Sequence, residues 1–121
     1  MAKKTVPLSL ADAPLVNRAA LVLIPTVAFL DWTRTCPDPD PGITLADLRE
    51  DPTVVLIPEG DDPEDWVEEH FLALFENELD GWCTDTATWP RGRDFNLFSG
   101  FLDVHLASMV LDLVKGPLRK G

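Results

Sequence analysis

Cysteine, basic residues and long apolar runs are all scarce in this chain. Its 121 residues include only two cysteines, Cys36 and Cys83, which lie far apart and form no CxxC motif. They predict reduced thiols in a cytosolic chain rather than a disulfide framework, with one disulfide between them as the alternative. The apolar run over 19–24 is closed by Pro25, so it is too short for a membrane span or a convincing signal peptide. We therefore expect a cytoplasmic protein with no membrane association.

Positive charge is the second scarcity. Ten lysines and arginines stand against 21 aspartates and glutamates, which gives a formal net charge of −11. Residues 38–80 hold fifteen of the acids and a single base, Arg49. Because phosphate binding needs a basic stripe, this distribution argues against nucleic acid and anionic membranes as partners. Solubility is the simplest function of so much charge, and a face that docks on a basic protein surface is the sharper alternative.

Catalytic and metal-binding motifs are missing as well. The sequence has no phosphate-cradling glycine loop, no Gly-x-Ser-x-Gly elbow and no calcium loop. Glu69 and His70 match part of a metalloprotease motif, but Leu74 occupies the position of its second histidine. A zinc site would have to be assembled from four scattered residues, Cys36, His70, Cys83 and His105. We therefore predict neither a metal nor a cofactor.

Apolar residues, by contrast, are sufficient for one core. At 45% hydrophobic residues, the chain can form a single compact domain and has no room for a second one. Residues 1–17 contain two prolines and no periodic pattern, which indicates an extended arm. Residues 18–114 form the predicted domain, and residues 115–121 form a basic tail.

Two strands are predicted by continuous apolar runs that end in proline. The runs over 19–24 and 53–57 are typical of strands buried on both faces. Each is followed by a helical segment with a tryptophan near its start, Trp32 or Trp66, and two such strand–helix units usually form a parallel pair. A third strand is predicted over 103–112 from alternation, although its apolar spacing also fits a helix.

The strongest helix signal spans residues 63–80. Asp62 is the expected N-cap, Pro63 suits the first helical position, and Gly81 is expected to end the helix in the left-handed conformation. An apolar stripe at helical spacing defines the buried face: Val67, Phe71, Leu74, Phe75 and Leu79. Acidic residues cover much of the remaining surface of this helix.

Shorter helices are predicted beside the long one. One spans 26–36, one begins at a capping box formed by Thr44 and Asp47, and one follows Asp94. Together these elements predict an α+β, or α/β, fold. We expect a small single-domain sandwich in which a mixed sheet of about three strands packs against the long acidic helix and the shorter helices.

The connector after the long helix concentrates tryptophan and arginine. Trp82, Trp89, Arg91 and Arg93 all lie in the irregular segment 81–94. The structural interpretation, which we favour, makes the indoles lids at the edge of the core and pairs both arginines with the acidic helix. The functional alternative is a groove for an anionic or aromatic ligand, because tryptophan and arginine often anchor interfaces.

A second candidate site lies on the third strand. Alternation places Asp103 and His105 on one face of this strand, two residues apart. An aspartate beside a histidine can orient the imidazole for general-base catalysis or ligate a metal. No nucleophile accompanies the pair, because Ser108 would lie on the opposite face, and we interpret the neighbourhood as incidental.

Several segments carry a family resemblance. In order along the chain they are AFLDW, LADLRED, VVLIPE, ELDGWCTD, WPRGRDF and FLDVHLASMVLDL. Over roughly residues 17–114 they resemble a family of small bacterial proteins that has no established activity. The resemblance implies one compact domain and implies nothing about function.

Two functions of different classes follow. The first is a non-catalytic interaction module, of the inhibitor, immunity or adaptor type, whose acidic helix face engages a basic protein surface. Its candidate residues are Asp61, Asp62, Asp65, Glu68, Glu69 and Glu76. The second is a small enzyme or ligand-binding domain with a cleft between the 82–93 connector and the pair Asp103 and His105. The absence of a catalytic constellation favours the first.

Overall fold

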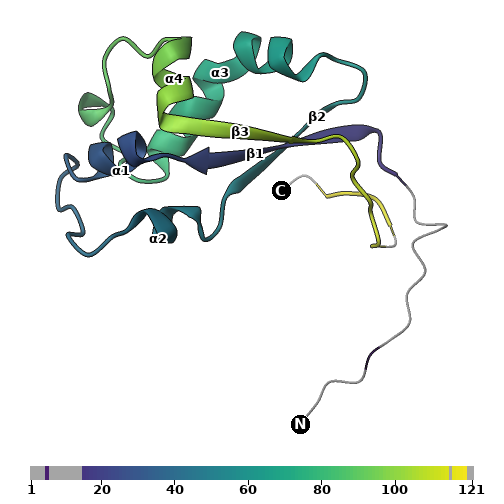
Figure 1. The fold of residues 1–121 in the computed structure, drawn as a ribbon, viewed down its shortest axis with the longest axis horizontal. Coiled ribbons are helices and arrows are strands. Elements are labelled where there is room, and N and C mark those ends of the chain that lie inside the picture. The colour runs from purple at the N-terminus through teal and green to yellow at the C-terminus, as the bar shows by residue number, and fades with distance from the viewer. Residues whose placement is uncertain (1–4, 6–14, 115, 120–121) are drawn as a thin grey trace.

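A three-stranded antiparallel sheet and four α-helices make up the described part of the fold (Figure 1). The computed structural model describes residues 5, 15–114 and 116–119. The elements are β1 (Arg18–Pro25), α1 (Val27–Thr33), α2 (Leu45–Arg49), β2 (Thr53–Pro58), α3 (Pro63–Asp80), a 3₁₀ turn η1 (Thr86–Thr88), α4 (Phe95–Phe101) and β3 (Leu102–Ala107). The predicted α+β class is confirmed. Most of the expected arm over 1–17 and part of the expected tail over 115–121 lie outside the described residues.

β1 is the central strand, which explains its continuous apolar sequence. The strand order is β2-β1-β3, with Leu21 opposite Val55 on one side and opposite Leu106 on the other. Leu21 and Leu23 are each 1% exposed and belong to the core. α3 and α4 lie on one side of the sheet and α2 lies on the other (Figure 1). The sheet face of Leu21 therefore points toward α3 and α4.

The predicted parallel pairing of the first two strands is wrong, because β1 and β2 are antiparallel. A parallel crossover needs a connection that runs back along the sheet. α1 has seven residues and α2 has five, which makes them about 10 and 8 Å long. The eight residues of β1 span about 26 Å. α1 and α2 are too short to carry the chain back to the start of β1. The chain therefore stays near the end of β1, and β2 runs back beside it in the opposite direction.

α3 is long enough to return the chain. Its 18 residues span about 27 Å. Both β2 and β3 are antiparallel to β1, so they run parallel to one another with β1 between them. All neighbouring strands are therefore antiparallel, and the predicted mixed sheet is not observed. The connection from β2 to β3 through α3 is nevertheless a long helical crossover, as strands that run parallel to one another require.

Two further expectations about the sheet need correction. β2 is an edge strand and is not buried on both faces, since Val54 and Leu56 are 57% and 44% exposed. β3 is confirmed as a strand but is shorter than predicted and ends at Ala107. A single bridge between Leu15 and Leu111 follows it, with the register shifted by one residue relative to the β1–β3 ladder. A shift of this kind interrupts the ladder.

α3 forms as its capping signals predict. The Asp62 carboxylate accepts hydrogen bonds from the backbone N–H groups of Glu64 and Asp65, at 2.9 and 3.1 Å. Pro63 occupies the first turn, where its missing N–H removes no helical hydrogen bond. The predicted apolar stripe faces the core, with three buried members followed by two half-buried ones: Val67, Phe75, Leu79, Phe71 and Leu74.

The C-terminal end of α3 differs from the prediction. Gly81 has a φ of −64° and a ψ of −20°, in the right-handed region rather than the left-handed one. The chain continues the turn, and the backbone N–H groups of Trp82 and Cys83 both donate to the carbonyl of Leu79, at 3.0 and 2.9 Å. These bonds satisfy a terminal carbonyl without a left-handed residue. The turn also brings Cys83 to the edge of the core.

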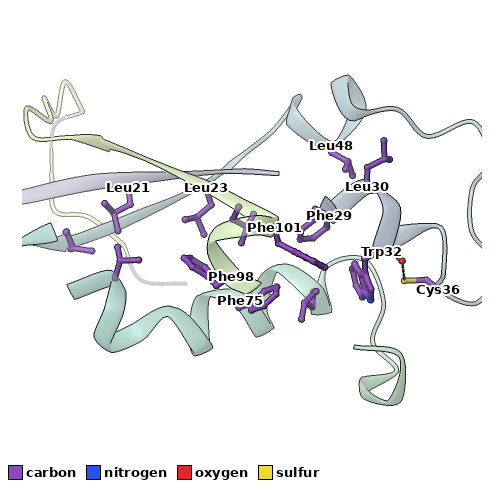
Figure 2. Packing of buried hydrophobic residues seen from close by; sticks show 14 residues of the cluster. Leu21, Leu23, Phe29, Leu30, Trp32, Cys36, Leu48, Phe75, Phe98 and Phe101 are labelled. Carbon is purple, nitrogen blue, oxygen red and sulfur yellow. Dashed lines mark hydrogen bonds between the residues drawn. The ribbon is translucent and has the colours of Figure 1, made fainter. Parts of the chain in front are cut away.

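Aromatic side chains from three helices form the centre of the core (Figure 2). Phe29, Phe75 and Phe98 are at most 1% exposed. The Phe101 ring centroid lies 5.9 Å from that of Phe29 and 5.4 Å from that of Phe75, both in edge-to-face contact. Such pairs add about 0.5–1.5 kcal/mol beyond simple burial. The cluster holds α1, α3 and α4 together and so positions the surfaces between them.

Candidate functional site

A groove of about 700 Å³ lies between the N-terminal half of α3, α4 and β3. Four buried core residues line its floor: Leu21, Val67, Phe98 and Leu102. Phe95 and Leu106 also line the groove, and they are 36% and 51% exposed. Apolar side chains that stay accessible above a buried apolar floor are typical of a binding groove.

Carboxylates line the α3 side of this groove. Asp62, Glu64 and Glu68 are all exposed lining residues, and together they form the acidic rim. Glu64 and Glu68 are one helical turn apart, so they project from the same side of α3. Within the described residues the only ion pair joins Arg34 to Asp31, at 3.9 Å. The groove therefore combines an apolar floor with carboxylates that no base in the described chain neutralises.

Only part of the predicted acidic face reaches the groove. Asp62 and Glu68 line it. The other four predicted acids do not: Asp61, Asp65, Glu69 and Glu76. Glu64 lines the groove and was not predicted, although its four-residue spacing from Glu68 could have indicated it. The accessible apolar partners of the rim, Phe95 and Leu106, come from α4 and β3, and no spacing along the sequence connects them with α3.

The connector is held together by internal contacts. The Trp89 indole donates to the carbonyl of Cys83 at 2.8 Å, and the Trp32 indole of α1 donates to the carbonyl of Thr88 at 3.0 Å. Arg93 lies over the Trp89 ring, 5.6 Å from its centroid, and donates to a backbone carbonyl of the connector at 2.9 Å. Both indoles and one terminal nitrogen of Arg93 have partners in their own chain, which favours the structural interpretation of this segment. The Nε of Arg93 is buried without a hydrogen-bond partner among the described residues.

The predicted pairing of the connector arginines with the acidic helix is wrong. Neither Arg91 nor Arg93 forms an ion pair with any described residue. Arg93 turns onto Trp89 instead, because the indole face and a nearby carbonyl accommodate its guanidinium. Trp89 packs against the core as a lid, whereas Trp82 is 42% exposed and lies outside the core cluster.

Asp103 and His105 share one face of β3, as predicted. They lie opposite Ile24 and Val22 of β1, on the sheet face that α3 and α4 do not cover. Because β3 is an edge strand, Asp103 still borders the groove described above, and it is the only one of the six ligand-groove candidates that does. The groove therefore does not unite the connector with the aspartate–histidine pair, as the second hypothesis requires.

The two cysteines come together beside the connector. Cys36 follows α1 and is buried, and its thiol donates to the carbonyl of Trp32 at 3.8 Å (Figure 2). Cys83 follows α3 and is half-buried, with its sulfur 3.0 Å from the hydroxyl oxygen of Thr88. Both are free thiols. Trp32, whose carbonyl accepts from Cys36, also bonds to Thr88, which contacts Cys83, so these two residues bring the thiols into one neighbourhood, where each influences the other. Nothing in their sequence spacing predicted this contact.

Their surroundings move the two thiol pKa values apart. Burial, together with hydrogen bonding to Cys83 and repulsion by its charge, raises the pKa of Cys36 to about 11. The hydrogen bond with Thr88 lowers the pKa of Cys83, and partial desolvation opposes this effect more weakly. Cys83 is thus both the thiol that ionises first and the more accessible of the two.

Metal ligands do not gather in the described residues. No three or more histidine, cysteine, aspartate or glutamate side chains there converge on a site that could hold a metal ion. His70 makes local contacts only, since its ring stacks on Trp66 at 4.2 Å and its Nδ1 donates to the Trp66 carbonyl at 2.7 Å. None of the described helices combines the length and the apolar character needed to cross a membrane.

Comparisons with known proteins assign no function. No protein-family model matches the chain, and searches of curated proteins and of solved structures find no match. The resemblance of its motifs to a family of small bacterial proteins stays a prediction. The function is therefore argued from the groove and its charge.

Proposed function

We propose that this protein is a non-catalytic interaction module, of the inhibitor, immunity or adaptor type, that binds a basic amphipathic segment of a partner protein. The observation that carries the proposal is the unneutralised acidic rim beside the accessible apolar side chains of Phe95 and Leu106, above a buried apolar floor. A partner segment with apolar residues on one side and lysine or arginine on the other would match both parts of the groove. The thiol pattern of the sequence favours a cytoplasmic setting for this interaction.

The accessible apolar side chains of the groove would supply most of the binding free energy. Phe95 and Leu106 are 36% and 51% exposed in the free protein. Complete burial of a large apolar side chain is worth about 1.5–3 kcal/mol, and apolar anchors of the partner that enter the groove gain a similar amount. A basic segment without such anchors should therefore bind weakly.

The acidic rim would supply orientation and association rate. An exposed ion pair adds only about 0.2–1 kcal/mol, so Asp62, Glu64 and Glu68 alone would not hold a partner. Their field, reinforced by the net charge of −11, attracts cationic segments and repels anionic ones, nucleic acid included. Association should slow as salt rises, because the Debye length falls from about 10 Å at 0.1 M to about 3 Å at 1 M.

Synthetic helical peptides provide the first test. The probe has leucines at i, i+3, i+4 and i+7 with lysines elsewhere, one control replaces the lysines by glutamates, and a second replaces the leucines by serines. Titration calorimetry at low and high salt measures affinity, and backbone amide shifts in NMR locate the site. We expect only the leucine–lysine peptide to bind, with its shifts around Val67, Phe98 and Leu106. Shifts that cluster on another surface would contradict the proposal.

Matched charge reversals on α3 distinguish the contribution of the groove acids to peptide binding from that of overall negative charge. The double variant Glu64→Lys/Glu68→Lys reverses two rim acids. The control Asp65→Lys/Glu69→Lys reverses two exposed acids, one position further along the helix, that do not line the groove. Both change the net charge equally. We expect at least about a tenfold loss of peptide affinity for the rim variant and less than about threefold for the control. Equal losses would show that net charge alone governs binding and would overturn the proposal.

A further inference from the structure

The thiol pair lies at the opposite end of α3 and takes no part in the proposed groove. Cys36 and Cys83 come from distant parts of the sequence, and two indoles hold those parts together. The Trp32 indole ties the end of α1 to the connector through the Thr88 carbonyl, at 3.0 Å. The Trp89 indole ties the connector to the Cys83 carbonyl, at 2.8 Å. These two hydrogen bonds hold the segments that carry Cys36 and Cys83 next to one another.

The two thiols have unequal surroundings. Cys36 is 7% exposed and belongs to the core, whereas Cys83 is half-buried at its edge. The Thr88 hydroxyl donates to the carbonyl of Asp85 at 2.7 Å, so the neutral Cys83 thiol donates to the Thr88 oxygen at 3.0 Å. When Cys83 ionises, this hydroxyl can rotate and donate to the thiolate, which is why the contact lowers the pKa of Cys83. Cys36, with a pKa of about 11, keeps its proton.

We propose that Cys83 is an oxidation site for hydroperoxides and that Cys36 resolves the oxidised form into an intramolecular disulfide. The Cys83 thiolate attacks one oxygen of hydrogen peroxide, the O–O bond breaks, and the departing hydroxide takes a proton from solvent and becomes water. Cys83 is then a sulfenic acid. The Cys36 sulfur attacks the Cys83 sulfur, the S–O bond breaks, and the leaving hydroxide carries off the Cys36 proton as a second water. Two thiols are oxidised and one peroxide is reduced.

The geometry orders these events. Burial shields Cys36 from direct attack by peroxide and by alkylating reagents, while Cys83 is accessible at the edge of the core. The disulfide would close the chain over 36–83, a segment that contains β2 and α3. Such a cross-link restricts the unfolded chain, so oxidation should raise the unfolding temperature. Neither cysteine lines the groove, so oxidation should leave binding of the leucine–lysine peptide unchanged.

Oxidation of the reduced full chain tests the proposal directly. After treatment with hydrogen peroxide, free thiols are counted with a chromogenic disulfide, and the mass and the non-reducing peptide map are recorded. We expect both thiols to disappear together, a monomer that has lost two hydrogen atoms, and a cross-linked peptide joining Cys36 to Cys83 that a dithiol reductant reverses. Intermolecular dimers or higher oxidation of Cys83 in place of this cross-link would overturn the proposal. A lower unfolding temperature after oxidation would do the same, because it would show that the bond does not fit the native contact.

Single-cysteine variants assign the two roles. In Cys36→Ser, peroxide should produce a sulfenic acid at Cys83 that dimedone traps, because no resolving thiol is present. In Cys83→Ser, Cys36 should react with iodoacetamide at least about tenfold more slowly than Cys83 does in Cys36→Ser. Equal rates, or dimedone adducts on Cys36, would reverse the assignment. Circular dichroism of both variants confirms that they are folded before the rates are compared.

A hydroxyl variant tests the activation of Cys83. Thr88→Val removes the hydroxyl beside the sulfur but keeps the backbone carbonyl that binds Trp32. We expect its Cys83 to alkylate more slowly at neutral pH, with the midpoint of the pH–rate profile moved upward. Thr84→Val changes an exposed threonine of the same connector and should leave the profile in place. An unmoved profile in Thr88→Val would mean that Thr88 does not activate Cys83.

Discussion

Charged and large apolar side chains gather at both ends of α3, but their contacts differ. At the N-terminal end, Glu64 and Glu68 are exposed beside accessible apolar side chains, and no base of the described chain pairs with them. At the C-terminal end, Trp89 and Arg93 contact each other and the backbone of their own connector. A segment rich in tryptophan and arginine is therefore no guide to a binding site by itself. The guide is whether those groups still lack partners once the chain has folded.

Removal of the Trp89 side chain should have the largest effect. The indole packs against the core and donates to the Cys83 carbonyl at 2.8 Å. We expect Trp89→Ala to lower the free energy of unfolding by about 3 kcal/mol, at the low end for tryptophan because the ring is only half-buried. Urea unfolding measures this loss. Affinity for the leucine–lysine peptide should be unchanged, measured under conditions where the variant is folded.

Leu106→Ala is the matched change at the other end. Leu106 is 51% exposed and lines the groove, so its truncation should cost less than about 1 kcal/mol of stability. The truncation should instead lower the affinity for the leucine–lysine peptide. If Trp89→Ala retained native stability and lost peptide binding, the connector would be the binding surface and the comparison would be reversed.

Asp62 sharpens the comparison, because it both caps α3 and belongs to the acidic rim. Asp62→Ala removes the cap and should destabilise the protein by about 1 kcal/mol. Asp62→Asn keeps a capping oxygen and removes only the charge, so its stability should stay within about 0.5 kcal/mol of wild type. Urea unfolding and peptide titration measure the two roles separately. Equal destabilisation by alanine and asparagine would assign the effect to charge rather than to capping.

Glu78, in the last turn of α3, is expected to have the smallest effect on stability and the one that depends most on pH. Burial raises the pKa of its carboxyl above the ordinary 4.5, and the Thr53 side chain opposes this only in part. The folded state therefore holds the Glu78 proton to higher pH than the unfolded state does. The stability that this gives is fully present below pH 4.5 and is lost as pH rises through the folded pKa. Once the carboxyl ionises, one of its oxygens, Oε1, is buried without a partner in the described chain.

Glu78→Gln removes that charge. We expect the variant to be more stable than wild type at pH 7, with the difference shrinking as the pH falls toward 4. Thermal unfolding between pH 4 and pH 7 measures the trend. Glu76→Gln, a change on the same helix at a carboxyl that lies outside the groove lining, serves as the control. A difference that stays constant across this range would show that burial of the charge at Glu78 is not the cause.

Helix starts were predictable because they depend on a few neighbouring residues, whereas the helix predicted over 26–36 ends earlier, at Thr33. Asp62 caps α3, and Asp94 caps α4 by accepting from the backbone N–H of Leu97 at 2.8 Å. Thr44 and Asp47 form the predicted capping box at the start of α2, with bonds of 3.2 and 2.8 Å. Such signals act across one helical turn, and the sequence contains that turn in full.

Strand direction and the candidate sites were less accessible to prediction. The proline-terminated runs indicated strands. They did not indicate that α1 and α2 are too short for a parallel crossover. The sequence predicted that Asp62 and Glu68 belong to one acidic helix face. It did not predict that Phe95 and Leu106 lie across a groove from them. Contacts of this kind join residues whose separation along the chain carries no periodic signal.

The sequence by itself determined the helices, the apolar stripe of α3 and the excess of negative charge, because periodicity and composition are local or additive properties. Only the tertiary structure decided which carboxylates border an apolar groove, which tryptophans are held by their own chain, and that Cys36 lies beside Cys83. Those outcomes depend on packing α1, α3 and α4 around one set of phenylalanines. Close packing of that kind brings distant residues into contact.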